Sequence, residues 1–419
     1  MGEYIHVNRW AEKAHALDRY RWLLLREHHG VIGSGLRFMR DAIGDWFFGV
    51  RAKWRLAQVV APGHCEFLLL QSAPKVVKLQ RKKLLIEGLR CRGYDLVETP
   101  LQSRKMLLRN RMFLRPPFWV PTRYFGLAAH AEWLSERYRP RIVLNDRNGS
   151  LYAPFLRLSL NERGGTLVHL AHATTVEGSR RLGMNDYDYY FMFGQSSLDA
   201  LQLRKLRFGS SVAVLAGSHM IDDAYDLPPA NPSHRTLLIL GVGPDKEKEP
   251  GYQATYSMLR AWASENPCYR VLIKAHPRSL ASFWRSASEQ LRNVEVLARE
   301  CTLADALRQV SVVVSIMSNA VIEAALARRP IVYANSSGEK DIFAQEQFFG
   351  ECVTTPQSLQ GKLDSIEKHY LASVGASEAF ARYHLAHGNQ GLEACLDLLE
   401  NLLNGEPCDG IRLDARWAE

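Results

Sequence analysis

One short stretch constrains the fold more than any other: an apolar run that ends in His276 and Pro277. Residues 271–273 (Val-Leu-Ile) suit a strand covered on both faces, and proline cannot donate to a sheet, so the strand is expected to stop there. His276 then lies at the carboxyl end of a central strand, the edge at which open α/β sheets bind ligands. The basic neighbours Lys274 and Arg278 favour an anionic ligand.

A second stretch downstream complements the first. Residues 311–315 predict another buried strand, which runs into a polar turn at Ser318 and Asn319 and then into a helix that contains Glu323. Either turn residue is a good N-cap, and the free backbone N–H groups of a helix start are suited to hold a phosphate. The two stretches together predict a phosphate clamp. The alternative is an ordinary strand–turn–helix unit with a histidine in a turn.

A glycine turn adds a weaker signal to this half of the chain. Gly241 and Gly243 follow the apolar run 236–240, as expected for a strand that ends in a phosphate-binding loop. A Gly-x-Gly turn by itself is weak evidence for such a loop.

The length of 419 residues exceeds one ordinary domain, so two are expected. The net charge of +9 favours anionic partners, and no recognised nucleic-acid module is visible, so nucleic acid is not a predicted partner. The seven cysteines form no Cys-x-x-Cys pair, which argues against both a disulfide framework and a zinc site. The start of the chain lacks the pattern of a signal peptide, and no apolar run spans a bilayer. A cytoplasmic protein is predicted, at most peripheral on the inner face of the cytoplasmic membrane.

Three regions are predicted. Residues 1–62 form a helical segment rich in basic and aromatic residues, residues 63–222 an α/β domain, and residues 223–419 a second α/β domain with C-terminal helices. The Pro-rich stretch 217–232 marks the hinge. In the first region Trp and Phe alternate with Arg and Lys, which predicts either an interfacial helix on an anionic membrane or a helical elaboration packed on the domain.

The first α/β domain contains three candidates for acid–base chemistry. Asp146 follows the predicted strand 141–145, and His172 and Glu177 follow the strand 166–170. The alternative for Asp146 is that it only caps a helix at 151–161. His169 and His172 would point to opposite faces of a strand, so a shared metal ion is not expected.

A further acidic pair, Asp186 and Asp188, has the spacing of a sugar-nucleotide metal motif. It leads directly into the apolar strand that begins at residue 189, which indicates a turn. No metal site and no cofactor are predicted.

The order of these motifs resembles the GT-B bacterial glycan-polymer transferases, a group that includes teichoic-acid glycerophosphotransferases, capsule Kdo transferases and polysialyltransferases. Their second domain carries a His-Pro motif, matched by His276 and Pro277, and a Ser-rich turn with an acidic helix residue, matched by Ser318 and Glu323. The resemblance implies an α/β protein of the GT-B class, with two Rossmann-like domains facing across a cleft and a helical basic N-terminal extension.

Three departures from the family pattern shift the expected chemistry. The Trp-His-Gly motif is replaced by Ala171-His172-Ala173, the Asp of the Ser-rich turn by Ile316, and the Pro-Arg of the interdomain segment by His219-Met220. These changes favour sugar transfer over glycerophosphate transfer.

The resemblance implies a CMP- or CDP-linked sugar donor held by the second domain, and a glycan or lipid-linked acceptor. His276 would bind or protonate the departing phosphate, Ser318 and Asn319 would hold it, and Glu323 would accept from ribose hydroxyls. Asp146, His172 or Glu177 would activate the acceptor hydroxyl. The alternatives are a CDP-glycerol or ribitol-type phosphotransferase, a non-catalytic partner in a polysaccharide assembly complex, and a nucleotide-sugar epimerase of the GT-B type.

Overall fold

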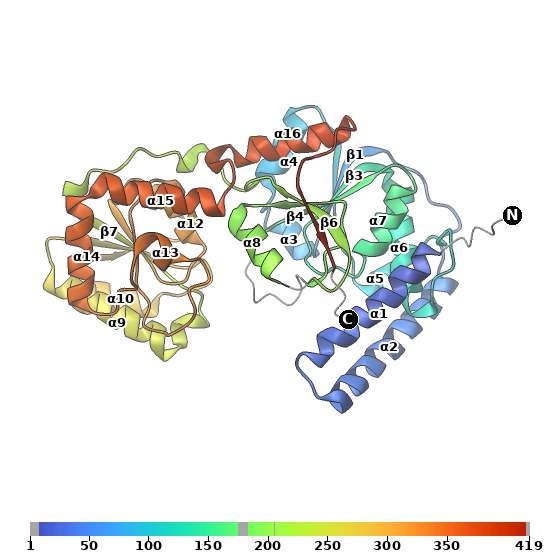
Figure 1. The fold of residues 1–419 in the computed structure, drawn as a ribbon, viewed down its shortest axis with the longest axis horizontal. Helices are drawn as coiled ribbons and strands as arrows, with labels where there is room; N and C mark the ends of the chain where they lie inside the picture. Colours follow the sequence, from blue (N-terminus) through green and yellow to red (C-terminus); the bar gives the residue numbers. More distant parts are fainter. Residues whose placement is uncertain (1–7, 175–182, 205, 416–419) are drawn as a thin grey trace. The chain divides into compact units, whose positions relative to one another are not determined.

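The computed structural model describes residues 8–174, 183–204 and 206–415. It divides into two compact units (Figure 1). The first comprises Met1–Met220 together with Leu392–Glu419, and the second comprises Ile221–Gly391. Each unit is a sheet of mostly parallel strands covered by helices, as expected from the alternation of short apolar runs and helical segments.

The first unit contains a seven-stranded sheet with the order β12-β6-β5-β4-β3-β1-β2. All neighbouring pairs are parallel except β12 with β6. The strands are β1 (Cys65–Gln71), β2 (Leu96–Pro100), β3 (Pro140–Asn145), β4 (Thr166–Leu170), β5 (Tyr189–Met192), β6 (Ser210–Leu215) and β12 (Ile411–Asp414).

Alternate residues of the central strands supply two apolar cores, one on each face of this sheet. Leu68 and Leu70 of β1 lie in one core with residues of α1, α6 and α7, while Phe67 and Leu69 lie in the other with residues of α4 and α16. The helices of this unit are α1 (Arg9–Arg26), α2 (Val31–Trp54), α3 (Pro74–Lys78), α4 (Lys83–Cys91), α5 (Arg104–Arg109), α6 (Thr122–Tyr138), α7 (Ala153–Asn161), α8 (Gln195–Leu203) and α16 (Gly391–Leu403).

The C-terminal end of the chain corrects the predicted domain division. We expected all of residues 223–419 in the second domain, but α16 and β12 belong to the first unit. Cys395 and Leu396 pack with Phe67 and Leu69 of β1 in one core, and β12 extends the first sheet beside β6. The apolar residues of α16 pack against the first sheet. The local sequence pattern predicts an apolar helix face but does not reveal which sheet covers it.

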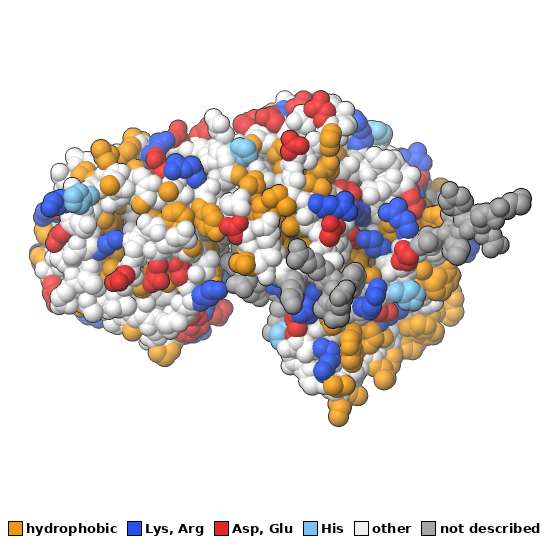
Figure 2. Space-filling view, in the orientation of Figure 1, with side chains coloured by type: hydrophobic (Ala, Val, Ile, Leu, Met, Phe, Trp, Pro, Cys, Tyr) orange, Lys and Arg blue, Asp and Glu red, His pale blue; other side chains and the backbone are white. Residues whose placement is uncertain are grey.

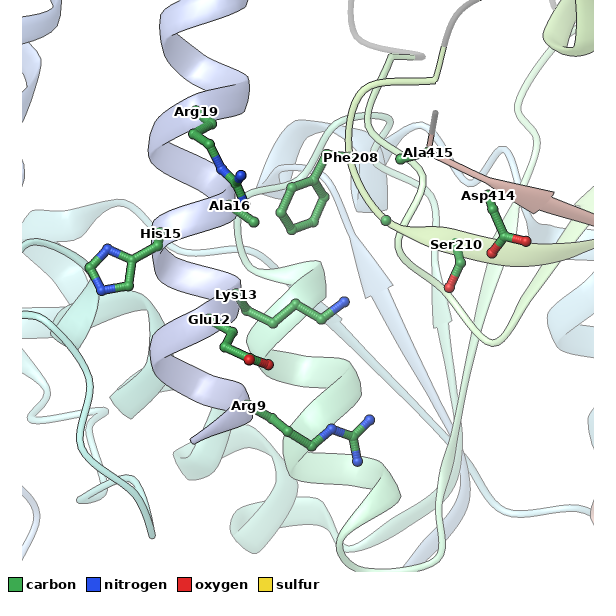
Figure 3. Close-up of a pocket in the computed structure, with 11 residues that line it drawn as sticks. Arg9, Glu12, Lys13, His15, Ala16, Arg19, Phe208, Ser210, Asp414 and Ala415 are labelled. Atoms are coloured by element: carbon green, nitrogen blue, oxygen red, sulfur yellow. The ribbon is translucent and has the colours of Figure 1, made fainter. Parts of the chain in front are cut away.

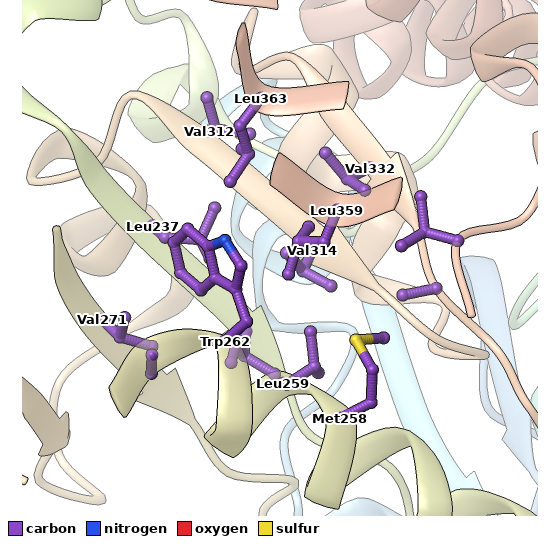
Figure 4. Packing of buried hydrophobic residues seen from close by; sticks show 14 of the residues in the cluster. Leu237, Met258, Leu259, Trp262, Val271, Val312, Val314, Val332, Leu359 and Leu363 are labelled. Carbon is purple, nitrogen blue, oxygen red and sulfur yellow. The ribbon is translucent and has the colours of Figure 1, made fainter. Parts of the chain in front are cut away.

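The second unit contains a five-stranded parallel sheet with the order β11-β10-β7-β8-β9. One face carries a core in which Trp262 and Leu259 meet Val271, Val314 and Leu359 (Figure 4). The strands are β7 (Thr236–Leu240), β8 (Arg270–Lys274), β9 (Val294–Val296), β10 (Val312–Ser315) and β11 (Ile331–Tyr333). The helices are α9 (Pro250–Glu265), α10 (Ser282–Gln290), α11 (Leu303–Arg308), α12 (Ala320–Leu326), α13 (Gln345–Phe349), α14 (Pro356–Lys368) and α15 (Tyr370–His384).

The basic and aromatic N-terminal region is a helical hairpin of α1 and α2. Trp10 and Tyr20 of α1 are buried in the first core, and Arg21 pairs with Asp45 of α2, with 2.5 Å between Nη1 and Oδ2. Helix α1 therefore matches the packed alternative. Among the described residues, no helix combines the length and apolarity that a membrane span requires.

Candidate functional site

Both sheets have a point at which the strand order reverses, and such switch points are the usual ligand sites of open α/β sheets. In the first sheet β2 lies on one side of β1 and β3 on the other, so the reversal falls between β1 and β3. In the second sheet it falls between β7 and β10. Among the described residues predicted from the sequence, Asp146, His172, Gly241 and His276 follow the carboxyl ends of these strands or of their neighbours β4 and β8.

The first-unit site is a cavity of about 600 Å³ at the switch point of the first sheet. Ser72 directly follows β1, and Asp146 directly follows β3. His172 is the second residue after the end of β4. All three line the cavity, and its remaining wall is basic or polar. The lining residues are Ser72, Lys75, Val76, Arg81, Lys82, Asp146, Arg147, Asn148, His172 and Met220.

Asp146 is the buried carboxylate of this cavity. Burial raises its pKa, and the charge of Lys82 opposes that shift. Its Oδ2 lies 3.9 Å from the Nζ of Lys82, while its Oδ1 is buried and has no hydrogen-bond partner among the described residues. A carboxylate with one free oxygen, a raised pKa and a nearby cation has the properties of a general base.

Lys82 and His219 are functional candidates that the sequence analysis missed. Both side chains are buried, at 2% exposure, and the Nζ of Lys82 lies 3.2 Å from the Nε2 of His219. Because an ammonium group only donates, the Nε2 of His219 accepts and its proton lies on Nδ1. Burial lowers the pKa of both groups. In the sequence Lys82 stands among the basic residues Arg81 and Lys83, and only the fold distinguishes the buried Lys82 from these exposed neighbours.

His172 lines the same cavity but remains open to solvent. Partial desolvation and the charge of Lys82 lower its pKa, so its neutral form is favoured at neutral pH. A neutral imidazole can accept a proton from an acceptor hydroxyl. Glu177, the third sequence-predicted candidate, lies outside the described residues.

The capping alternative for Asp146 fails, because α7 begins at Ala153 and its N-cap is Tyr152. The other histidine of this region, His169, is structural. Its Nδ1 lies 3.1 Å from the amide nitrogen of Asn145, and its Nε2 lies 2.6 Å from Oδ1 of Asn148. With both ring nitrogens engaged and a pKa lowered to about 3 by burial, His169 stays neutral and fixes the loop after β3.

The carboxylates of Asp186 and Asp188 are both engaged with cations of the protein. Arg157 donates to Asp186 at 2.8 Å and to Asp188 at 2.9 Å, and Lys13 contacts Asp186 at 2.6 Å. This turn therefore ties α7 and α1 to the sheet. Across the described ranges, no group of three or more His, Cys, Asp or Glu side chains has an arrangement that could hold a metal ion.

The second-unit site begins with a close approach of two strand ends. A Cβ at Gly241 would lie 3.1 Å from three backbone atoms of residues 274–276, so the absence of a side chain lets β7 and β8 end side by side. His276 follows there, partly exposed. Its Nδ1 accepts from the backbone N–H of Arg278 at 3.1 Å, which leaves the proton of the neutral ring on Nε2. Burial and the charge of Arg278 lower its pKa.

The two basic residues near His276 differ in whether their charged groups already contact the protein. The ammonium group of Lys274 donates to the backbone carbonyl of Cys301, so it braces the loop before α11. Arg278 is exposed, and its Nη2 would lie 3.9 Å from a Cβ at Gly243. Of the two, Arg278 is the cation available to a ligand above the glycine turn. Pro277, between them, is exposed and follows the end of β8.

The turn after β10 departs from the prediction in one respect. Asn319 is the N-cap residue of α12, as expected, but the helix has only seven residues. Its first three N–H groups already have acceptors within the turn: the Oγ of Ser318 for Ala320, the carbonyl of Ser318 for Val321 and the carbonyl of Asn319 for Ile322. The N–H groups are therefore not free to hold a phosphate, because the tight turn uses them, and the polar side chains are the remaining donors.

Glu323 lies in the first turn of α12. Burial raises its pKa to about 7, and its Oε2 is buried without a hydrogen-bond partner in the described part of the chain. A carboxyl group in this state can accept from a ligand hydroxyl that enters the site. The neighbouring Tyr225, in the short helix Asp223–Tyr225, also has a pKa raised by burial and by Glu323.

A second cavity of the first unit, of about 500 Å³, lies between α1 and the strands β6 and β12 (Figure 3). Lys13, Arg19 and Phe208 line it together with Ser210, the first residue of β6. It therefore lies at the amino ends of the parallel strands, the edge opposite to the usual ligand edge. Lys13 is already engaged with Asp186. We do not assign this cavity to the functional site.

Comparison with known proteins identifies the fold. No protein-family model matches the chain, and no curated protein matches it by sequence. Among solved structures, a candidate UDP-N-acetylglucosamine 2-epimerase from Listeria monocytogenes is similar with a TM-score of 0.53 and 10% identity, covering 83% of this chain and 98% of the other. The S. aureus MnaA-UDP structure has a TM-score of 0.50 and 11% identity, covering 83% and 99%. Another UDP-N-acetylglucosamine 2-epimerase has a TM-score of 0.50 and 13% identity, covering 84% of this chain and 100% of the other. These likenesses and the two parallel sheets show the GT-B fold, with two Rossmann-like domains.

Proposed function

We propose that the protein is a glycosyltransferase that transfers a sugar from a nucleotide donor to a glycan or lipid-linked acceptor. The observation that carries the proposal is the division of chemistry between the two switch points. The first-unit site holds the groups that move protons, Asp146 and His172, and the second-unit site holds groups that bind an anion, His276 and Arg278.

In this proposal the second unit binds the nucleotide part of the donor. The Nε2–H of His276 donates to a phosphate oxygen of the leaving nucleotide, and Arg278 neutralises the charge that develops there. Ser318 and Asn319 add side-chain donors from the strand on the other side of β7. Because neighbouring strands lie about 4.8 Å apart, β8 and β10 end about 10 Å apart, which leaves space for a phosphate group above Gly241.

The carboxylate of Glu323 accepts from a ribose hydroxyl of the bound nucleotide. The family resemblance favours a cytidine nucleotide, CMP- or CDP-linked. The fold relatives favour a uridine nucleotide, since one of them is an MnaA-UDP complex.

The first unit activates the acceptor. Asp146 takes the proton of the attacking hydroxyl, and the charge of Lys82 opposes the rise in the pKa of this carboxyl group that burial causes. The hydroxyl oxygen attacks the anomeric carbon, the bond from that carbon to the nucleotide phosphate breaks, and the phosphate takes the electron pair. In this proposal no metal ion is needed, because Arg278 offsets the phosphate charge and the Nε2–H of His276 donates a hydrogen bond to it. Full activity in excess chelator would support this part of the proposal, and loss of activity would contradict it.

The experiment that tests the proposal is a binding panel with CMP, CDP, UDP, GDP and ADP on the wild type and His276→Ala. A ligand that binds only the folded state raises its melting temperature with concentration. We expect one nucleotide class to raise it, and the shift to disappear in the variant. No shift with any of the five would contradict the proposed donor site and favour a non-catalytic partner in polysaccharide assembly.

A second candidate function is a nucleotide-sugar epimerase, favoured by the fold relatives with the highest TM-scores given above. An epimerase converts the donor sugar without an acceptor, whereas a transferase releases nucleotide only when an acceptor is present. Incubation of the protein with the donor that the panel identifies, with and without glycan acceptors, separates the two. A phosphotransferase of the same fold would instead leave a phosphodiester in the product.

A further inference from the structure

Helix α2 is apolar on the face that points away from the protein. Surface helices normally place polar residues there. Besides Val31 at its first position, seven large apolar side chains of α2 are instead between 50% and 82% exposed. They form what we call the outward face of α2: Ile32, Leu36, Met39, Ile43, Trp46, Phe47 and Trp54.

The spacing of these residues shows that they form one continuous ridge. Steps of three, four and seven residues place them along one side of a helix. The stretch from Ile32 to Trp54 is about 33 Å long at 1.5 Å per residue. Figure 2 shows hydrophobic side chains gathered along the margin of the molecule where Figure 1 labels α2. An exposed apolar surface of this extent marks an interaction site.

The opposite side of α2 is fixed on the first unit, so the ridge is held in place. A Cβ at Gly49 would lie 1.7 Å from the carbonyl oxygen of Thr122, which shows that α2 and α6 are in backbone contact. The buried carboxylate of Asp45 receives ion pairs from Arg21 and Arg104, each at 2.5 Å. Phe48 stacks edge-on against Phe113, with 5.8 Å between ring centroids. The inward side therefore accounts for the packing of α2 on the first unit, while the outward face is exposed.

The charges beside the ridge indicate what it meets. Arg37, Arg40 and Arg51 are exposed on α2, and Arg55 follows directly at its end. The acidic residues of the helix, Asp41 and Asp45, are both paired with arginines. The flank of the ridge is therefore positive, and two copies of the chain joined through it would bring like charges together.

We propose that the outward face of α2 is a membrane-docking surface that lies in the head-group region of an anionic bilayer. Its aliphatic residues would enter the acyl boundary, Trp46 and Trp54 would sit at the level of the head groups, and the flanking arginines would pair with lipid phosphates. This assigns the membrane contact to α2 and not to the arginines of α1. It stands independently of the nucleotide chemistry proposed above.

The test is co-sedimentation of the full chain with vesicles of 70% phosphatidylcholine and 30% phosphatidylglycerol at 150 mM salt. The face variant is Leu36→Ser/Ile43→Ser/Phe47→Ser, whose three positions are exposed, so the fold should be retained. The matched control is Leu203→Ser/Leu280→Ser/Leu371→Ser, which removes three apolar side chains at least 74% exposed elsewhere on the surface. We expect the face variant to bind at least tenfold more weakly and the control to bind like the wild type.

The contribution of the flanking arginines is tested with the variant Arg37→Glu/Arg51→Glu. It should bind these anionic vesicles several-fold more weakly than the wild type, and its weak binding to pure phosphatidylcholine should be unchanged. Wild type that does not sediment with anionic vesicles, or a face variant that sediments as the wild type does, would overturn the proposal. So would a wild-type dimer in sedimentation analysis that the face variant converts to a monomer, because the partner would then be a second copy.

Discussion

The two switch-point sites of the molecule use opposite physical means. The first-unit site places charged groups out of solvent: Lys82 and Asp146 are both buried, and their pKa values are shifted by that burial. The second-unit site keeps Arg278 exposed and His276 half-buried, and burial there raises the pKa of the half-buried Glu323. Proton transfer benefits from a desolvated base, whereas binding of a nucleotide from solution needs donors that it can reach. This contrast is the basis on which we propose catalysis at the first site and donor binding at the second.

The largest effect is expected from Asp146→Asn, which removes the base and keeps its shape. Turnover with the donor and acceptor identified as above should fall about 10²- to 10⁴-fold, the usual contribution of a general base. Nucleotide binding, followed by calorimetry, should not change. The exposed Asp409→Asn serves as the control. Turnover above half of the wild-type value would break the assignment of catalysis to the first site.

The next largest effect concerns stability, through Glu323→Gln. Burial raises the folded-state pKa of Glu323 to about 7 from its ordinary value of 4.5, so the folded protein binds the proton more tightly than the unfolded chain. The contribution of Glu323 to stability is therefore complete below pH 4.5 and is lost as the pH rises to about 7. The variant should be more stable than the wild type at pH 8 by at most about 3 kcal/mol, and equal to it at pH 4.

Calorimetric unfolding between pH 4 and pH 8 measures this difference. Glu351→Gln, at an exposed position, should follow the wild type at every pH. If Glu323→Gln does so too, the carboxyl group is ionised in the folded state and the contrast in burial between the two sites is smaller than described.

Lys82→Met tests whether the cation tunes the base. Without the charge of Lys82, the pKa of Asp146 should rise, because burial is no longer opposed. The acidic limb of the pH dependence of kcat/KM should therefore move to higher pH by about one unit. At high pH, where Asp146 is ionised in both proteins, kcat/KM should differ less between the variant and the wild type. A limb that does not move would show that Asp146 is not the titrating base.

The smallest effect separates two neighbouring cations of the second site. Arg278→Met should weaken binding of the nucleotide found in the panel about fivefold, the range of one exposed ion pair. Lys274→Met should change it less than twofold, because that ammonium group is engaged with the carbonyl of Cys301. Titration calorimetry measures both. Equal losses of affinity in the two variants would mean that the ammonium group of Lys274 leaves the carbonyl of Cys301 and binds the ligand.

Much of the fold could be predicted from short-range pattern. Short apolar runs, several of them followed by Pro, Gly or Asp, located most strands and therefore the strand ends that carry Asp146 and His276. Between β1 and β2 the chain forms two helices, α3 and α4, and not one. The segment 104–121 contains α5 and buries Leu107 and Phe113. Boundaries of this kind depend on tertiary packing, which overrides local propensity.

The sequence by itself determined which residues end the strands, because strand-breaking and polar residues act within a few positions of the chain. Only the tertiary structure decided that Lys82 and His219, 137 positions apart, meet beside Asp146. The same holds for the return of α16 to the first sheet and for the side of α2 that faces outward. Burial of a charge and exposure of an apolar face depend on which distant surfaces come together, and periodicity along the chain records only that a helix has two sides.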